Sequence, residues 1–176
     1  MRPNKQAGFT LIEILFVVAI IGIISAMALP RLLMAKQAAD ASSAIASLRT
    51  INSSQAGYSM SCGSGFYAPD LTVLAQIPPG GNLAFISPDL SYAPSPVKSG
   101  YTFQLVGTAS PAAPATCNGV PAGAATKSFK AGADPGTPTN YRYFATNSAH
   151  TIYEDTSSLW AAMPEVGVPA TGHPLE

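Results

Sequence analysis

The chain has few of the side chains that carry most protein chemistry. Of its 176 residues, 10% are charged, two are histidine, two are cysteine and one is tryptophan. The sequence contains no P-loop, no G-x-G-x-x-G fingerprint and no G-x-S-x-G nucleophile elbow. Its two histidines form no metal motif, and two isolated cysteines lack the paired spacing of a tetrahedral zinc site. We therefore predict a protein that is not an enzyme and holds no cofactor.

The chain also lacks an excess of positive charge. Nine Lys and Arg residues balance nine Asp and Glu residues, so the formal net charge is zero. Proteins that bind nucleic acids carry a basic patch or stripe. Lys127, Lys130 and Arg142 form no cluster in the sequence. We predict no nucleic-acid partner.

Apolar side chains are abundant in the first thirty residues. Residues 9–29 are an almost unbroken apolar run, and a helix needs roughly 20 such residues to cross a bilayer. Arg2 and Lys5 precede the run and favour a cytoplasmic N-terminus by the positive-inside rule. The sequence predicts one transmembrane helix over residues 9–29.

An ordinary secretory signal is the rival interpretation. Residues 26–28 (Ala-Met-Ala) match the small-residue pattern of a signal-peptide cleavage site, after a charged start and an apolar core. However, the run is longer than the usual core of about 7–15 residues and contains one acid, Glu13. Both features favour a retained anchor.

Glu13 is the only charged residue in the apolar run. A carboxylate at mid-membrane costs about 2.5–3.5 kcal/mol, and less near the end of a helix. The residual cost predicts a partner for this charge, which need not come from the same chain. The alternative is that Glu13 reaches the lipid headgroups from the helix end.

The sequence Gly8-Phe9-Thr10-Leu11-Ile12-Glu13, followed by the long apolar tail, resembles the processing signature of type IV pilins and of the pseudopilins of type II secretion. The resemblance covers about the first fifty residues. It implies that a prepilin peptidase cuts between Gly8 and Phe9, so that residues 1–8 are a leader, and that the new Phe9 amine is N-methylated. It also implies that Glu13 neutralises the Phe9 amine of a neighbouring subunit. Pro30 falls where many members of the family carry a helix-bending proline.

The same resemblance implies the partners and location of the chain. The expected partners are copies of itself in a helical filament, the prepilin peptidase and N-methyltransferase, an inner-membrane assembly platform, and membrane lipid before assembly. The subunit starts as a single-pass protein of the bacterial inner membrane and ends in a pilus at the cell surface or in the periplasm. A type IV pilin is the main hypothesis. A secretion pseudopilin is the close alternative, and a membrane-anchored binding module or enzyme is a third.

One long helix is predicted over residues 9–57, with a local bend at Pro30 because proline lacks an N–H donor. After the bend, apolar residues recur at helical spacing and form a face suited to lie on a sheet: Ala38, Ala41, Ile45, Leu48 and Ile51. The opposite face carries small residues that suit either close helix packing or solvent: Ala39, Ser42, Ser43, Ala46 and Ser53.

Residues 58–176 are predicted to form a globular head of an α+β protein, with the long helix packed on a small antiparallel sheet of three or four strands. Residues 70–76 suggest a short helical turn. Strands are expected at residues 83–86, 100–107, 141–146 and 149–154, with 127–130 as a weaker candidate. Residues 110–123 and 131–139 are rich in proline and glycine and predict loops. Asn147-Ser148 suggests a two-residue hairpin turn.

The head contains both cysteines, Cys62 and Cys117. If the transmembrane helix places the head outside the cytoplasm, a disulfide is expected there, and two free thiols are the alternative. Closing this loop would stabilise the head by about 4 kcal/mol in the chain-entropy model. Some pseudopilins carry calcium in a terminal loop, which makes Glu154 and Asp155 weak calcium candidates. Solvated turn acids are the ordinary interpretation, and we predict no metal.

Overall fold

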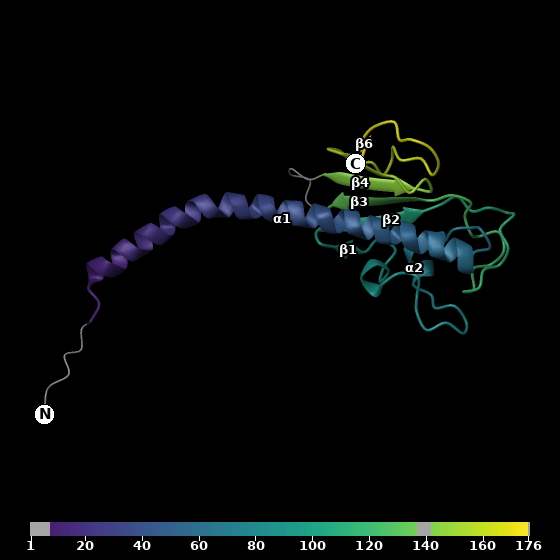
Figure 1. The fold of residues 1–176 in the computed structure, drawn as a ribbon, viewed down its shortest axis with the longest axis horizontal. Helices are drawn as coiled ribbons and strands as arrows, with labels where there is room; N and C mark the ends of the chain where they lie inside the picture. Colours follow the sequence, from purple (N-terminus) through teal and green to yellow (C-terminus); the bar gives the residue numbers. More distant parts are fainter. Residues whose placement is uncertain (1–7, 137–141, 176) are drawn as a thin grey trace, which may run out of the picture. The chain divides into compact units, whose positions relative to one another are not determined.

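The computed structural model describes residues 8–136 and 142–175. The chain divides into two compact units, residues 1–39 and residues 40–176, called unit 1 and unit 2 below. Most of the predicted leader and Tyr141, the first residue of a predicted strand, lie outside the described residues. The helix α1 (Leu11–Ser61) contributes its first part to unit 1 and its second part to unit 2 (Figure 1). By length and composition, α1 could cross a membrane.

Within unit 2, the part of α1 after residue 40 packs one face into the core. The buried apolar side chains recur at three- and four-residue spacing, as expected for a helix face on a sheet: Ala41, Ala44, Leu48, Ile51 and Tyr58. The predicted face is therefore confirmed at Ala41, Leu48 and Ile51. Ile45 is half-buried and Ala38 is exposed, because the buried stripe runs through Ala44 instead.

Two polar side chains of α1 connect this helix to the rest of unit 2. The side-chain amide of Gln55, which is fully buried, donates to the Ala68 carbonyl and accepts from the Ala68 N–H, both at 2.9 Å. Asn52 donates to Thr146 Oγ1 at 3.0 Å. Buried polar groups are costly unless paired, so these bonds fix how α1 sits against the chain that follows.

The sheet of unit 2 is an antiparallel meander of six strands, in which each strand pairs with the next along the chain. A short α2 (Leu71–Leu74) and a 3-10 helix η1 (Pro88–Leu90) precede it. The strands are β1 (Val97–Lys98), β2 (Tyr101–Val106), β3 (Lys130–Pro135), β4 (Tyr143–Asn147), β5 (Ile152–Asp155) and β6 (His173–Pro174). The α+β class with a long helix on an antiparallel sheet is thus confirmed.

Both faces of the sheet are covered. Alternate residues of β2 to β4 join the α1 core: Tyr101, Phe103, Leu105, Ala131, Ala133 and Phe144. On the other face, a second cluster joins the sheet to the segment after β5: Ala145, Tyr153, Leu159 and Met163. The Trp160 ring also lies against Gly132, where an added Cβ would come within 2.9 Å of it. The C-terminal segment therefore acts as a second layer.

Two of the predicted elements match closely. The strand expected at residues 100–107 is β2, with Tyr101, Phe103 and Leu105 buried on one face. The helical turn expected at 70–76 is α2. The Asp70 side chain caps it by accepting from the N–H groups of Thr72 and Val73.

Several other predictions were wrong. Residues 83–86 form no strand, since the N–H groups of Phe85 and Ile86 donate to the Leu74 carbonyl at the end of α2. The strand expected at 127–130 shares only Lys130 with the observed β3, which continues to Pro135 through the first part of the predicted loop 131–139. Its glycine and proline misled the prediction: Gly132 makes room for the Trp160 ring, and Pro135 stands at the strand end.

The number of strands and one turn also differ from expectation. The sheet has six strands because β1 and β6, each of two residues, extend it at both edges. The β4–β5 hairpin forms, but Asn147-Ser148 is not a two-residue turn, since Thr146 pairs with Ile152. The Asn147 carbonyl accepts from the His150 N–H at 2.8 Å, and His150 has a φ of 62°. This longer turn reverses the chain through a left-handed residue.

Candidate functional site

The first described residues place the predicted cleavage site just before α1. Gly8, Phe9 and Thr10 are exposed and precede the helix, which begins at Leu11. A Cβ added at Gly8 would meet nothing within 4 Å. Gly8 and Phe9, the two residues of the predicted scissile bond, therefore lie in open, non-helical backbone.

Thr10 forms the N-terminal cap of α1. Its Oγ1 accepts a hydrogen bond from the Glu13 N–H at 3.3 Å, and its carbonyl accepts the first intrahelical bond, from Ile14, at 3.3 Å. A side-chain oxygen on the third helical N–H satisfies one of the donors that a helix start leaves free. Sequence reasoning missed this role of Thr10. The signal was present, because Thr10-x-x-Glu13 followed by an apolar run is the pattern of a capping box.

Glu13 lies in the first turn of α1 and is exposed. A carboxylate near a helix N-terminus interacts favourably with the helix dipole. Glu13 and Phe9 are thus near the same helix end, with the Thr10 cap between them. Their predicted pairing across neighbouring subunits stays a prediction.

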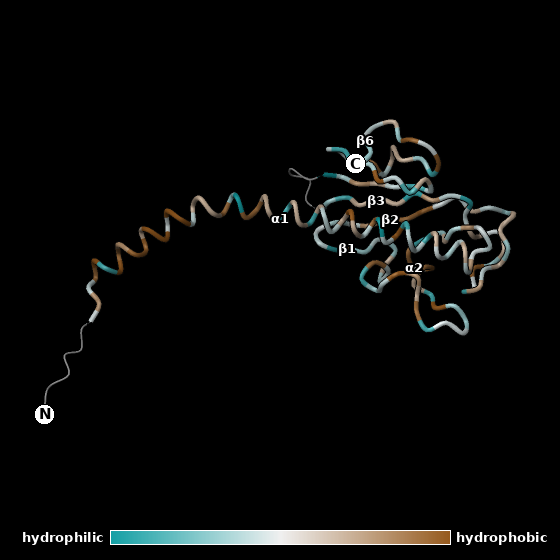
Figure 2. Tube along the Cα trace, in the orientation of Figure 1, coloured by the Kyte–Doolittle hydropathy of each residue, from teal (hydrophilic) through white to brown (hydrophobic). Residues whose placement is uncertain are grey.

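The apolar surface that follows is uncovered in the single chain. Every side chain from Gly8 to Lys36 is exposed, and the first part of α1 is mostly hydrophobic, as the brown segment in Figure 2 shows. Single subunits of soluble proteins rarely expose apolar patches of such extent unless the patch faces a membrane or a partner. This surface requires lipid or other protein around it.

Pro30 lies inside α1, which continues through it. Because proline has no N–H, the carbonyl four residues earlier, at Ala26, loses its helical donor. The predicted bend at Pro30 stays a prediction.

The predicted disulfide is present in unit 2. Cys62 and Cys117 are bonded, with their Cα atoms 4.9 Å apart, and the Cys117 N–H donates to the Cys62 carbonyl at 3.2 Å. Cys62 directly follows α1, so the bond ties the end of the helix to the loop after β2. The adjacent Asn118 reinforces this tie by donating to the Val73 carbonyl at 2.9 Å.

Tyr58 lies beside this disulfide and is fully buried. Its hydroxyl donates to the Asn118 side-chain oxygen at 3.2 Å. Burial raises the pKa of the Tyr58 phenol above its ordinary value, so the side chain is neutral across the physiological range. Its role is to pack the end of α1 and hold the disulfide loop.

The weak calcium candidates, Glu154 and Asp155, are engaged by other groups. The Glu154 carboxylate forms an ion pair with Arg142 and a hydrogen bond of 2.9 Å with His173 Nε2. Asp155 accepts from the Thr156 N–H at 2.6 Å. Among the described residues, no group of three or more His, Cys, Asp or Glu side chains could hold a metal ion.

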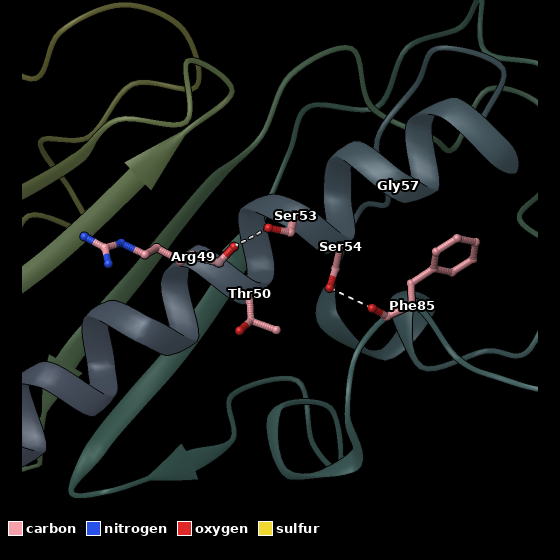
Figure 3. Close-up of a pocket in the computed structure, with 6 residues that line it drawn as sticks. All are labelled: Arg49, Thr50, Ser53, Ser54, Gly57 and Phe85. Atoms are coloured by element: carbon pink, nitrogen blue, oxygen red, sulfur yellow. Dashed lines mark hydrogen bonds between the residues drawn. The ribbon is translucent and has the colours of Figure 1, made fainter.

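One shallow groove lies on the exposed face of α1 in unit 2 (Figure 3). Its volume is about 380 Å³, and it is lined by Arg49, Thr50, Ser53, Ser54, Gly57 and Phe85. The three hydroxyls already donate to the carbonyls of Ala46, Arg49 and Phe85 at 3.0, 3.0 and 2.7 Å. A hydroxyl has one proton to donate, so they offer a ligand only acceptors. We assign no ligand to this groove.

Comparison with known protein families gives one match. Residues 3–29 match the prokaryotic N-terminal methylation motif. Neither curated proteins nor solved structures give a match to this chain. The match spans the predicted cleavage site, Glu13 and the apolar run, and it ends just before Pro30.

The motif and the fold together define the class of protein. The chain carries the prepilin-type cleavage and methylation motif of the type IV pilin and pseudopilin family. Its fold is the pilin-like α+β arrangement of a long N-terminal apolar helix and an antiparallel sheet. It is a type IV pilin-like protein.

Proposed function

We propose that this chain is a structural subunit of a helical filament, most specifically a type IV pilin used in adhesion, motility or DNA uptake. The observation that carries the proposal is the methylation motif at residues 3–29, which continues into a fully exposed apolar helix. A surface of this kind needs lipid before assembly and protein after it. A filament made of copies of this chain provides the protein environment that the helix needs after assembly, and no other kind of protein is required.

The first step of the proposal is removal of residues 1–8. A prepilin peptidase hydrolyses the Gly8–Phe9 peptide bond. One water molecule is consumed: its hydroxyl group completes the new Gly8 carboxyl group, and its proton goes to the new Phe9 amine. An N-methyltransferase then moves a methyl group from its methyl donor to that amine. The exposed, non-helical backbone at Gly8 and Phe9 supports this site.

The second step pairs charges between subunits. An α-amino group has an ordinary pKa near 7.7–8.0 and is mostly protonated at neutral pH. In a low-dielectric bundle, the Phe9 ammonium of one subunit and the Glu13 carboxylate of the next would each reduce the desolvation cost of the other. Removing one partner from such a pair costs about 3–5 kcal/mol. The pair would thus set the register of assembly.

The remaining assignments follow from this order of events. We propose residues 1–8 as leader, 9–57 as the anchor and stalk with a membrane span over 9–29, and 58–176 as the head; the helix itself is α1, Leu11–Ser61, which begins two residues later and ends four residues later than predicted. The subunit waits in the inner membrane with its N-terminus in the cytoplasm, and an assembly platform then moves it into the filament. A head-to-tail contact that does not close a ring generates such a filament.

The proposal is tested by shearing surface filaments from the producing cells, imaging them by electron microscopy and sequencing their main band by mass spectrometry. We expect filaments whose main band begins with N-methylated Phe9 and lacks residues 1–8. A fibre confined to the periplasm, with protein export lost on deletion, would replace the pilin with the pseudopilin alternative. A mature protein that remains single in the membrane would contradict the filament role altogether.

A further inference from the structure

The Thr10 hydroxyl caps the start of α1. Thr10 has both marks of an N-cap: its carbonyl accepts the first helical bond from Ile14, and its Oγ1 accepts from the Glu13 N–H. Gly8 and Phe9, the described residues before it, are outside the helix and exposed. The open backbone at Gly8 and Phe9 is thus directly followed by the residue that caps the helix, Thr10.

The start of α1 lies next to the proposed cleavage site, so its position affects access of the peptidase to the scissile bond. The Gly8–Phe9 bond precedes Leu11, the first helical residue, by two positions. Inside a helix, a peptide carbonyl is bonded within the chain and side chains surround it. Exposed, irregular backbone is where proteolytic cleavage concentrates. A helix that began earlier would carry the scissile bond into its first turns.

We propose that Thr10 is a positioning residue for leader removal, because its hydroxyl stops α1 after the Gly8–Phe9 bond and keeps that bond accessible to the peptidase. The inference rests on the proposed cleavage after Gly8. It assigns to Thr10 a role in the precursor that ends when the leader is cut. Thr10 acts through backbone conformation and not by touching the reacting atoms.

The leader sequence offers one residue that could cap a helix earlier in the chain. Asn4 is the nearest upstream residue of the Ser, Thr, Asp or Asn type that caps helices well. If the Thr10 cap is lost, a start at Asn4 becomes competitive and places Gly8 and Phe9 within the helix. Only the fraction of precursor with the later start then binds the peptidase productively. The apparent affinity of the peptidase for the precursor falls in proportion to this fraction, and the rate of the chemical step is unchanged.

The experiment uses full-length precursor in detergent micelles and membranes that contain prepilin peptidase. Initial cleavage rates are measured against precursor concentration for the wild type, Thr10→Val and Thr10→Ser. Thr50→Val is the matched control, because the Thr50 hydroxyl also bonds a helix backbone group, the Ala46 carbonyl, but lies far along α1. Backbone NMR shifts of residues 8–11 report where the helix begins, independently of cleavage.

For Thr10→Val we expect an apparent KM about 2- to 30-fold higher, the range expected for loss of an N-cap side chain, with kcat unchanged. We also expect helical shifts at Gly8 and Phe9. Thr10→Ser, which keeps the hydroxyl, and Thr50→Val should match the wild type in both measurements.

Two outcomes for Thr10→Val would overturn the inference. One is wild-type cleavage kinetics despite helical shifts at Gly8 and Phe9, and the other is a helix start that does not move. If the wild-type precursor is not cut after Gly8 at all, the proposed processing fails, and this result is distinct from either outcome for Thr10.

Discussion

Gly8 has space for a larger side chain within its own chain. A Cβ there meets no atom within 4 Å, so a substitution has no folding cost that the structure reveals. Any effect on processing must then arise in the peptidase, which would have to accept the added methyl group beside the scissile bond. A substitution at Gly8 therefore tests recognition by the peptidase without changing the stability of the chain.

We predict that Gly8→Ala blocks leader removal while the protein still folds and inserts. Gel mobility and N-terminal sequencing of the membrane fraction measure this directly, and the precursor should accumulate at its full length. Gly22→Ala is the control, since Gly22 lies in the same apolar helix and also has open space around a Cβ. Normal processing of Gly8→Ala would show that the site is assigned wrongly.

At the scale of elements, the disulfide joins two segments that are not paired as strands and are otherwise connected by single hydrogen bonds, such as that from the Cys117 N–H to the Cys62 carbonyl. One is the end of α1 at Cys62, and the other is the irregular chain between β2 and β3 that contains Cys117. A bond that closes a loop of 55 residues removes conformational freedom from the unfolded chain. In the chain-entropy model its contribution grows with the length of the closed loop.

Replacing both cysteines with serine should lower the free energy of unfolding by about 2–4 kcal/mol, since the unfolded chain regains the freedom of the open loop. Urea denaturation in detergent, followed by tryptophan fluorescence, measures the change. The wild type in reducing agent should show a similar loss, and the double variant should no longer respond to reductant. Equal stability of variant and wild type would mean that the loop is held by its other contacts, such as those of Asn118 and Tyr58.

A second tie between elements depends on one carboxylate. Glu165, in the segment after β5, accepts hydrogen bonds from Thr108 at 2.7 Å and Ser128 at 2.8 Å. Burial alone would raise the pKa of Glu165. The hydrogen bonds from Thr108 and Ser128, together with the charge of Lys130, outweigh burial and hold the pKa below its ordinary value.

This lowered pKa makes a prediction about stability and pH. A group that holds its proton less tightly in the folded state stabilises the fold above its unfolded pKa, near 4.3 for glutamate. That contribution disappears as the pH falls through the lower folded pKa. We expect Glu165→Gln to melt at a lower temperature than the wild type at pH 7, with the difference shrinking below about pH 4. Thermal melts from pH 7 to pH 3 measure this, and a difference independent of pH would show that the carboxylate charge is not the cause.

These elements show how far sequence reasoning reached. The 3.6-residue and two-residue patterns predicted the second part of α1 and β2 well, because each has one buried face and one less buried face. They failed at β3, where both faces are covered, so small residues replace the alternation: Ala131, Gly132 and Ala133. Strands as short as β1 and β6 carry no periodic signal at all.

The same limits apply to the candidate site. The sequence Gly8–Glu13 predicted the cleavage motif, which the family match then supported. The Thr10 cap was legible as a capping box but was not recognised. The contacts of Glu154 with Arg142 and His173 could not be read from the sequence, because strand pairing brings these residues together.

At the scale of the whole molecule, Glu13 connects the single chain to its assembly. It is a charge on an otherwise apolar, exposed segment. In a bilayer, lipid headgroups can reach a carboxylate near the helix end. In the interior of a filament, only protein groups can compensate it.

We predict that Glu13→Gln inserts normally into the membrane but lowers the filament yield at least hundredfold, consistent with the cost of leaving the Phe9 ammonium buried and unpaired. Sheared filaments are quantified against membrane-bound subunit by immunoblotting. Gly22→Ala again serves as a control within the same segment. Filaments formed normally by Glu13→Gln would defeat the charge-pairing proposal, although the filament role itself would stand.

The sequence alone determined the apolar helix, the processing motif and one face of the head, because these depend on local periodicity and on residues adjacent in the chain. Tertiary structure decided the number of strands, the true position of β3, the partners of Glu154 and the hydrogen bonds that Glu165 accepts from Thr108 and Ser128. These features join residues far apart in the chain. Local pattern cannot specify such contacts, since they form only when the second layer packs on the sheet.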